Sequence, residues 1–314
     1  MHRHSIVETI LEKTLLAHNN HVIDGINKDL RPFPWSSLEE TKEYYLELAG
    51  DWEDPYGTPK IVEHEGIRVV RDDYLTGSKV RGGDCLISSL PEEIDTIVYV
   101  QPRTGLAGVS ILDVAKHHNK KVKLFMPSSK QISVHQACCI ERGAEVSFHR
   151  IAAMPNLNLI AKKWADEHSN AFFVPLGLKH ELVTAGMVKS ASKIKEPEEV
   201  YVATSTGVLT RSLQIAWPNA KFTSVCVSRN MKAGELGIAE AISEPLPFTT
   251  SEKANNLPPF PNIDTYDGKV WKYIPKNSGK DILFWNVGKE PVLQNLDIIK
   301  ETNSYREWPK NEVA

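Results

Sequence analysis

Cysteine is scarce in this sequence of 314 residues. Only four occur, at Cys85, Cys138, Cys139 and Cys226, and none belongs to a C-x-x-C pair or lies beside a histidine cluster with metal-ligand spacing. This pattern predicts reduced and mostly buried thiols, and it argues against a disulfide framework or a zinc site. We therefore expect no bound metal ion.

The sequence also lacks a long apolar run and a strong excess of charge. No window approaches the roughly 18 uninterrupted apolar residues of a membrane span, and residues 1–20 read as a charged amphipathic helix rather than a secretory signal. We therefore expect a cytoplasmic protein that does not enter a membrane. The net charge of −3 and the pI near 6.4 give no global footprint for nucleic acid. The basic segment Lys116–Lys123 (KHHNKKVK) leaves a local contact open.

Strand-like and helix-like runs alternate between Ile94 and Gly177. Short apolar runs such as DTIVYVQ and KVKLFMP are separated by helix-like runs such as GVSILDVAKHH, and the alternation resumes near residue 199. This order is typical of repeated β-α-β units and a parallel sheet. The chain exceeds the usual size of a single core, so we predict two packed subdomains. No G-x-G-x-x-G follows a predicted strand, which argues against a dinucleotide-binding protein.

Four segments near predicted strand ends carry the residues on which a functional prediction depends. Thr58–Ile87 (TPKIVEHEGIRVVRDDYLTGSKVRGGDCLI) contains Lys79 among small and charged residues, and Val100–Pro127 begins with VQPRTGLAG. Val202–Leu213 (VATSTGVLTRSL) offers hydroxyl groups and a glycine where a strand turns into a helix, an arrangement suited to an anion. The fourth segment, Asp281–Pro291, reads DILFWNVGKEP.

In this order and spacing, the four segments resemble those of fold-type II enzymes that use pyridoxal 5'-phosphate (PLP), the tryptophan synthase β superfamily. The sequence is most similar to the subgroup containing 1-aminocyclopropane-1-carboxylate deaminase and D-cysteine desulfhydrase. The resemblance implies an α/β fold of two three-layer parallel-sheet subdomains. Residues 58–90 and 178–314 would form the larger, PLP-binding domain and residues 91–177 the smaller one. Residues 1–57 match nothing in the family and are predicted to form an N-terminal helical arm.

The resemblance also assigns residues to the site. It implies that Lys79 is the catalytic residue and binds PLP as a Schiff base, a role that requires a partly desolvated and neutral amine. The implied phosphate cup consists of Thr204, Ser205, Thr206 and Gly207. The implied substrate-binding residues are Arg103, Thr104, Gly105, Gly108 and Tyr266.

Two positions depart from the family pattern. Leu106 stands where an asparagine contacts the phenolic oxygen of the cofactor, and Val287 stands where a threonine contacts its pyridine nitrogen. Neither side chain can form the hydrogen bond it replaces. Asn286, beside Val287, is the remaining candidate for the ring nitrogen.

The resemblance implies a PLP-dependent lyase or deaminase that acts at Cα or Cβ of an amino-acid moiety. We expect a small amino acid or an amino-acid-modified nucleotide as the substrate, and a homodimer as the assembly. The two departures also fit a PLP-dependent decarboxylase or lyase acting on an amino-acid group attached to a nucleobase, in phage DNA hypermodification. A further alternative is a non-catalytic binding module that keeps the PLP fold.

Overall fold

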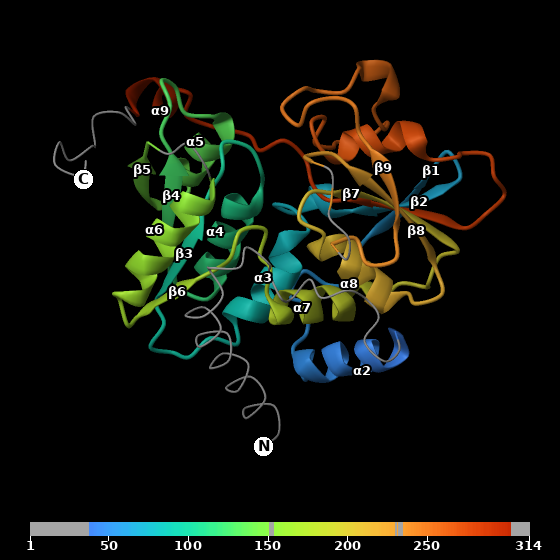
Figure 1. Cartoon of the computed structure of the whole chain (residues 1–314), viewed down its shortest axis with the longest axis horizontal. Coiled ribbons are helices and arrows are strands. Elements are labelled where there is room, and N and C mark those ends of the chain that lie inside the picture. The colour runs from blue at the N-terminus through green and yellow to red at the C-terminus, as the bar shows by residue number, and fades with distance from the viewer. Residues whose placement is uncertain (1–37, 151–153, 230, 232–234, 303–314) are drawn as a thin grey trace. The chain divides into compact units, whose positions relative to one another are not determined.

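The computed structural model describes residues 38–150, 154–229, 231 and 235–302. The chain divides into two compact units, Met1–Ser89 with Lys179–Glu290, and Leu90–Leu178 with Pro291–Ala314 (Figure 1). Each unit is built on a largely parallel sheet with helices, which confirms the predicted α/β class. None of the helices in the described part of the chain has the length and hydropathy needed to cross a membrane.

The larger unit contains a six-stranded sheet with the order β1-β2-β10-β7-β8-β9. Strand β1 pairs antiparallel with β2, and every other neighbouring pair is parallel. Strands β7 and β10 are buried along their whole length, which explains their nearly continuous apolar sequences. The strands span Ile61–His64 (β1), Ile67–Arg71 (β2), Glu199–Thr204 (β7), Lys221–Cys226 (β8), Glu240–Ser243 (β9) and Ile282–Asn286 (β10).

Alternate residues of these strands form the two faces of the sheet, because side chains two apart point the same way. On one face, Val69, Tyr201 and Phe284 pack with Trp271 of the 3-10 helix η4 (Asp267–Tyr273). Three helices of this unit pack on one another in sequence, α3 with α7 and α7 with α8, and α2 packs on α7 and α8. They span Leu38–Ala49 (α2), Lys79–Ile87 (α3), Glu181–Ala191 (α7) and Val208–Ala216 (α8).

The helix α2 belongs to the predicted N-terminal arm. It packs on α7 and α8 of the larger unit, and Lys42 Nζ donates to the carbonyl of Ala216 at 2.7 Å. Residues 1–37 of the predicted arm, including the amphipathic helix expected over residues 1–20, lie outside the described residues. The described part of the arm is therefore a packed component of the larger unit.

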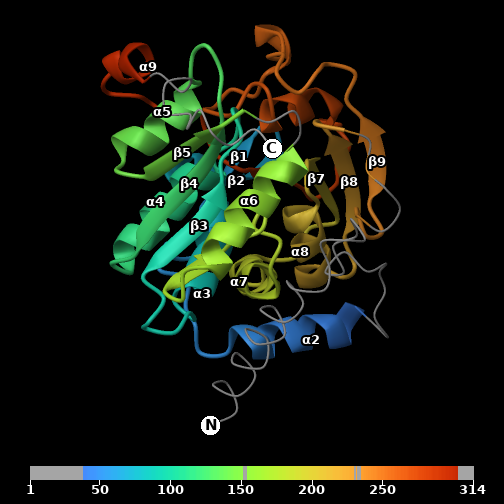
Figure 2. The same cartoon turned by 60° about the vertical axis from the view of Figure 1, so that its left-hand side comes forward.

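The smaller unit contains a four-stranded parallel sheet with the order β5-β4-β3-β6. Helix α6 packs on β3, β4 and β6 through residues such as Leu157 and Ala161, whereas α4 packs on β3, β4 and α5 (Figure 2). The direction of the crossovers reverses between β5 and β6, so right-handed connections place α6 on the opposite face. The elements span Thr96–Val100 (β3), Ala107–His117 (α4), Lys121–Pro127 (β4), Val134–Glu141 (α5), Glu145–His149 (β5), Met154–Asp166 (α6) and Ala171–Phe173 (β6).

The segment after Glu290 groups with the smaller unit. The Glu141 carboxylate on α5 accepts hydrogen bonds from the backbone N–H groups of Gln294 and Asn295, and helix α9 (Asp297–Glu301) packs on α5. The resemblance implies that all of residues 178–314 belong to the larger domain, whereas in the structure residues 291–302 group with the smaller unit. The Glu141 carboxylate that anchors this segment lies about 150 residues earlier in the chain. No local sequence pattern predicts this contact.

Two glycines allow α3 and α7 to cross at close range. A Cβ atom on Gly82 would lie 2.4 Å from the carbonyl oxygen of Val183, and one on Gly186 would lie 2.6 Å from Cβ of Cys85. Contacts this short require a neighbour to move, and a helix carbonyl has little freedom to do so. The crossing fixes α3, which begins at Lys79, against α7.

We predict that Gly82→Ala destabilises the protein. Helix propensity alone would favour alanine by about 1 kcal/mol, but overpacking against a backbone atom typically costs about 1–3 kcal/mol. We expect overpacking to win, with a net loss of about 1 kcal/mol in the free energy of unfolding. Urea denaturation measures this loss. If Gly82→Ala unfolds at the same urea concentration as the wild type or at a higher one, α3 and α7 accommodate the added methyl group without loss of stability.

Candidate functional site

The carboxyl ends of β2, β10 and β7 lie side by side at one edge of the larger sheet, the edge at which open parallel sheets bind ligands. Strand β2 leads through the 3-10 helix η2 (Asp72–Tyr74) into α3, whose first residue is Lys79. The N–H of Ser78 donates to the carbonyl of Val287, directly after β10, at 2.8 Å. The neighbouring strand β7 leads into residues 205–207. Lys79 and the predicted phosphate cup therefore start from the same edge of one sheet.

The Lys79 side chain is half-buried, and no hydrogen bond or ion pair joins it to another described residue. Removal from water lowers the pKa of its amine, because burial disfavours the charged form. The amine is therefore neutral over a wider pH range than that of an exposed lysine. The neutral form is the one that attacks a carbonyl group.

The loop after β7 offers hydrogen-bond donors at the start of α8. Ser205 and Thr206 are partly exposed, and Gly207 adopts φ of +79° as the residue before the helix. A Cβ atom at Gly207 would lie 2.2 Å from the carbonyl oxygen of Glu235, so the backbone conformation and the close packing both require glycine. No side chain caps α8, and the N–H groups of its first turn have no partner within the helix.

Thr204 differs from the other predicted cup residues. Its side chain is buried, and its hydroxyl lies 2.5 Å from that of Thr210 and accepts a hydrogen bond from Ser224 at 2.6 Å. These contacts use the hydroxyl inside the unit, so the predicted role of Thr204 as a side-chain ligand is not supported. The donors left to a ligand are the hydroxyl groups of Ser205 and Thr206 and the N–H groups at the start of α8.

Tyr266, predicted to contact substrate, lies against the same loop. Its hydroxyl donates to the carbonyl of Ala203 at 3.3 Å and accepts a hydrogen bond from the N–H of Ser205. Burial raises the pKa of Tyr266, so the phenol stays protonated. In the structure Tyr266 therefore holds the end of β7 in place.

The end of β10 is held by a residue that the sequence analysis missed. The fully buried Asp267 carboxylate accepts hydrogen bonds from the backbone N–H groups of Ile263 and Val287, both at 2.8 Å. Burial raises its pKa to about 7, although these hydrogen bonds act in the opposite direction. The D-G pair in the sequence signals only a turn, and nothing there indicates burial.

The contacts of Asn286 give no support to its predicted hydrogen bond with the ring nitrogen of the cofactor. It is fully buried, and its amide nitrogen donates to the Asp73 carboxylate and to the carbonyl of Pro261, both at 2.9 Å. Both amide hydrogens are therefore used within the unit. The oxygen of the same amide is buried without a hydrogen-bond partner among the described residues.

The predicted substrate loop of the smaller unit is organised by Gln101, a second residue that the sequence analysis missed. The buried Gln101 amide donates to the carbonyls of Pro102 and Gly105 and accepts the N–H of Gly108 at 2.8 Å. The predicted ligand contact through the Gly108 N–H is therefore not available. The exposed Arg103 donates to the carbonyl of Gln131 at 3.1 Å, and Thr104 is partly exposed.

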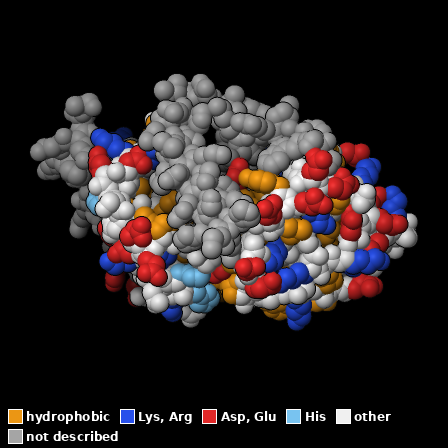
Figure 3. Space-filling model, turned by 90° about the horizontal axis from the view of Figure 1, so that it is seen from below, with side chains coloured by type: hydrophobic (Ala, Val, Ile, Leu, Met, Phe, Trp, Pro, Cys, Tyr) orange, Lys and Arg blue, Asp and Glu red, His pale blue; other side chains and the backbone are white. Residues whose placement is uncertain are grey.

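The basic segment Lys116–Lys123 is largely engaged within its own unit. Lys120 donates to the carbonyl of Ile94, Lys121 lies 3.5 Å from Asp95, and Lys123 pairs with Glu145. On the face drawn in Figure 3, acidic and basic side chains of the described residues are interspersed. These observations give no support to a nucleic-acid substrate. Among the described residues, no group of three or more His, Cys, Asp or Glu side chains is placed to hold a metal ion.

The residues present fit PLP. A half-buried amine without a partner among the described residues suits an aldehyde, and the uncapped start of α8 with the Ser205 and Thr206 hydroxyls suits a phosphate group. Both features belong to the carboxyl edge of one sheet.

Solved structures with the same fold are enzymes. No protein-family model and no curated protein sequence matches the chain. The structure is similar to the processed form of threonine deaminase isoform 2 from Solanum lycopersicum, with 13% identity, a TM-score of 0.62, and coverage of 86% of this chain and 90% of that chain. It is also similar to an ACC deaminase homologue, with 17% identity, a TM-score of 0.62, and coverage of 78% of this chain and 94% of that chain. A third similar structure is a pyridoxal 5'-phosphate-dependent aspartate racemase, with 13% identity, a TM-score of 0.53, and coverage of 81% of this chain and 97% of that chain. The chain therefore has the fold of the fold-type II PLP enzymes, as its sequence predicts.

The buried Asp267 generates a pH-dependent prediction. Its pKa of about 7 in the folded protein exceeds the value of about 3.9 in an unfolded chain. The folded state therefore keeps a proton that the unfolded state has lost, and the resulting stabilisation is complete below about pH 4 and disappears as the pH rises to 7. We expect the free energy of unfolding of the wild type, minus that of Asp267→Asn, to fall over this range.

Urea denaturation of both proteins at several pH values measures this difference. The asparagine variant does not titrate, so subtracting its curve removes the contribution of every other group that behaves alike in both proteins. A difference that stays constant or increases from pH 4 to pH 7 would contradict a raised pKa at Asp267.

Proposed function

We propose that the protein is a PLP-dependent enzyme that binds its cofactor covalently through Lys79 and acts at Cα or Cβ of an amino-acid moiety, as a lyase or deaminase. The observation that carries this proposal is the half-buried Lys79 amine, which has no partner among the described residues and lies at the ligand-binding edge of the larger sheet. The shared fold supports the cofactor class. Fold alone does not define a reaction.

The larger unit supplies two attachment points for the cofactor. Lys79 would hold the cofactor through its amine, which can condense with the aldehyde to form a C=N bond with release of the aldehyde oxygen as water. The hydroxyl groups of Ser205 and Thr206 and the first N–H groups of α8 provide donors for the phosphate. When bound, the cofactor supplies an electron sink for the bonds at the substrate Cα.

Lys79 has a second task in this proposal. When its amine is not bound to the cofactor, Lys79 would take a proton from the substrate Cα as a general base and return it as a general acid. The lowered pKa of Lys79 favours this task, because a larger fraction of the amine is neutral near physiological pH. No histidine or carboxylate contacts the amine among the described residues.

The end of β10 favours elimination over reactions that need a strongly electron-withdrawing ring. By resemblance, Val287 occupies the position that contacts the pyridine nitrogen. Its N–H donates to Asp267 and its carbonyl accepts from Ser78, so neither backbone group is directed to a ligand. In a β-elimination the leaving group at Cβ takes the electron pair, so the ring needs to stabilise less charge.

We predict that PLP forms a covalent adduct with Lys79. Incubation with PLP, reduction with borohydride and peptide mapping should place the pyridoxyl group on this residue, because its amine loses a proton more easily than the amine of an exposed lysine. Lys79→Ala should lose the adduct, whereas the control Lys121→Ala, which removes a lysine whose side chain is 78% exposed, should retain it. An unmodified Lys79 peptide would contradict the proposal.

Turnover separates the enzyme from the binding-module alternative. Addition of small amino acids carrying a leaving group at Cβ should release ammonia and a 2-oxo acid from the wild type and not from Lys79→Ala. An adduct on Lys79 without turnover of any amino acid would favour a module that binds the cofactor and does not catalyse.

A further inference from the structure

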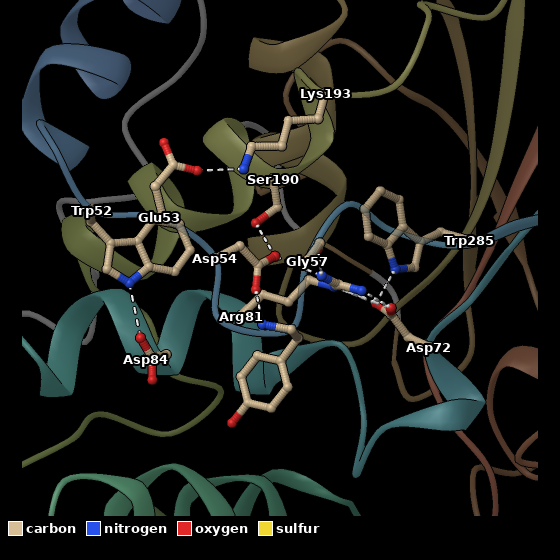
Figure 4. A network of polar contacts seen from close by, with 11 residues as sticks. Trp52, Glu53, Asp54, Gly57, Asp72, Arg81, Asp84, Ser190, Lys193 and Trp285 are labelled. Carbon is tan, nitrogen blue, oxygen red and sulfur yellow. Dashed lines mark hydrogen bonds and ion pairs between the residues drawn. The ribbon is translucent and has the colours of Figure 1, made fainter.

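The segment between α2 and β1 binds directly to the helix that carries Lys79. The indole Nε1 of Trp52 donates to the Asp84 carboxylate at 2.9 Å, and Oδ2 of Asp54 accepts a hydrogen bond from Nη1 of Arg81 at 2.6 Å. Asp84 and Arg81 both belong to α3. Figure 4 shows Trp52 and Asp54 pointing toward α3 from this segment.

The same carboxylate also reaches α7. Oδ2 of Asp54 accepts a second hydrogen bond, from the hydroxyl of Ser190, at 2.7 Å. Between Trp52 and Asp54, Glu53 forms ion pairs with Lys189 of α7 and with Lys193, which follows the end of this helix. Three consecutive residues thus join two helices that cross at their glycines, and Asp54 contacts both (Figure 4).

Burial makes the contacts of Asp54 and Arg81 stronger than those of Glu53. The side chains of Arg81 and Asp54 are 3% and 0% exposed, whereas that of Glu53 is 68% exposed. Exposed ion pairs are screened by water and salt, but buried pairs keep their strength and their direction. The position of α3 therefore depends on Asp54 more than on Glu53.

Lys79 lies between two anchored residues. On one side the N–H of Ser78 donates to the carbonyl of Val287, and on the other side Arg81 binds the carboxylates of Asp54 and Asp72 and the carbonyl of Gly57. Only Val80 separates Lys79 from Arg81. A shift of the Arg81 side chain is therefore transmitted to the backbone that carries the Lys79 amine.

We propose that Trp52 and Asp54 are positioning residues for Lys79, acting through Asp84 and Arg81 of α3. This gives a role to a segment that the sequence predicts only as part of an N-terminal arm. This inference rests on the proposed function, because it takes cofactor binding to be the task of the Lys79 amine. The positioning itself is a property of the protein without cofactor.

Two variants and one control test the proposal. Asp54→Asn removes one acceptor and the charge, and Ser190→Ala removes one donor to Asp54 while leaving every charge in place. Asp51→Asn is the matched control, because it makes the same chemical change three residues earlier at an exposed carboxylate that contacts no described residue. Circular dichroism and urea denaturation establish that each protein is folded.

The first measurement uses the protein without cofactor. Labelling with trace acetic anhydride across a range of pH, followed by mass spectrometry of the Lys79 peptide, gives the pH midpoint at which this amine becomes reactive. In Ser190→Ala we expect a looser α3 and a Lys79 that is more accessible to water, so the midpoint should rise toward that of exposed lysines. A residue that only stabilised the fold would leave the midpoint unchanged in the folded protein.

The second measurement is the rate at which PLP attaches to Lys79. Displacement of a reacting group by about 1 Å can cost up to about 100-fold in rate. We expect attachment to slow by about tenfold in Ser190→Ala and by up to about 100-fold in Asp54→Asn. The control Asp51→Asn should match the wild type in both measurements.

The proposal is overturned if folded Asp54→Asn and Ser190→Ala attach PLP at the wild-type rate and keep the wild-type labelling midpoint. If Asp54→Asn does not fold, Ser190→Ala decides alone by the same two measurements. Failure of wild-type protein to attach PLP would refute the proposed function instead. The labelling midpoint would still show whether Asp54 positions the amine.

Discussion

The buried guanidinium of Arg81 constrains the arrangement of the larger unit. A charge removed from water costs several kcal/mol unless partners compensate it, and the Arg81 side chain is 3% exposed. Asp72 binds it in the same network and also accepts a hydrogen bond from the indole of Trp285, the penultimate residue of β10, at 2.9 Å. One cation thus fixes the segment before β1, the turn after β2, the start of α3 and the central strand.

A second buried carboxylate acts on the same strand by a different means. Asp267 has no cationic partner among the described residues and is bound by backbone N–H groups alone, whereas Asp72 has a guanidinium. Burial raises the pKa of both carboxyl groups, and at Asp72 the Arg81 guanidinium opposes this rise. At Asp267 only backbone N–H groups oppose it and the pKa reaches about 7, so the end of β10 is held by a group that titrates near neutrality.

The sequence predicts the fold better than it predicts the contacts within the site. Buried parallel strands such as β3 and β7 read as continuous apolar runs, and the segment around Lys79 carries its own small and charged residues. The direction of a polar side chain at a strand end is not encoded in this way. Thr204 and Asn286 turn inward to partners within the unit, and Asp54 meets a partner 136 residues away. Such pairings exist only once the chain has folded.

The two departures from the family pattern lie in backbone that is held by other residues. Gln101 binds the carbonyl of Gly105 and the N–H of Gly108 on either side of Leu106, and Asp267 binds the N–H of Val287. A buried amide or carboxylate is costly unless its hydrogen bonds are made, so each loop is held by contacts in which the side chain at position 106 or 287 takes no part. The conformation of these loops is therefore set by Gln101 and Asp267, whereas the polar contacts offered to a ligand depend on other side chains in the loops. The side chains of Leu106 and Val287 thus offer a ligand no hydrogen bond, although the backbone around them is held by polar contacts.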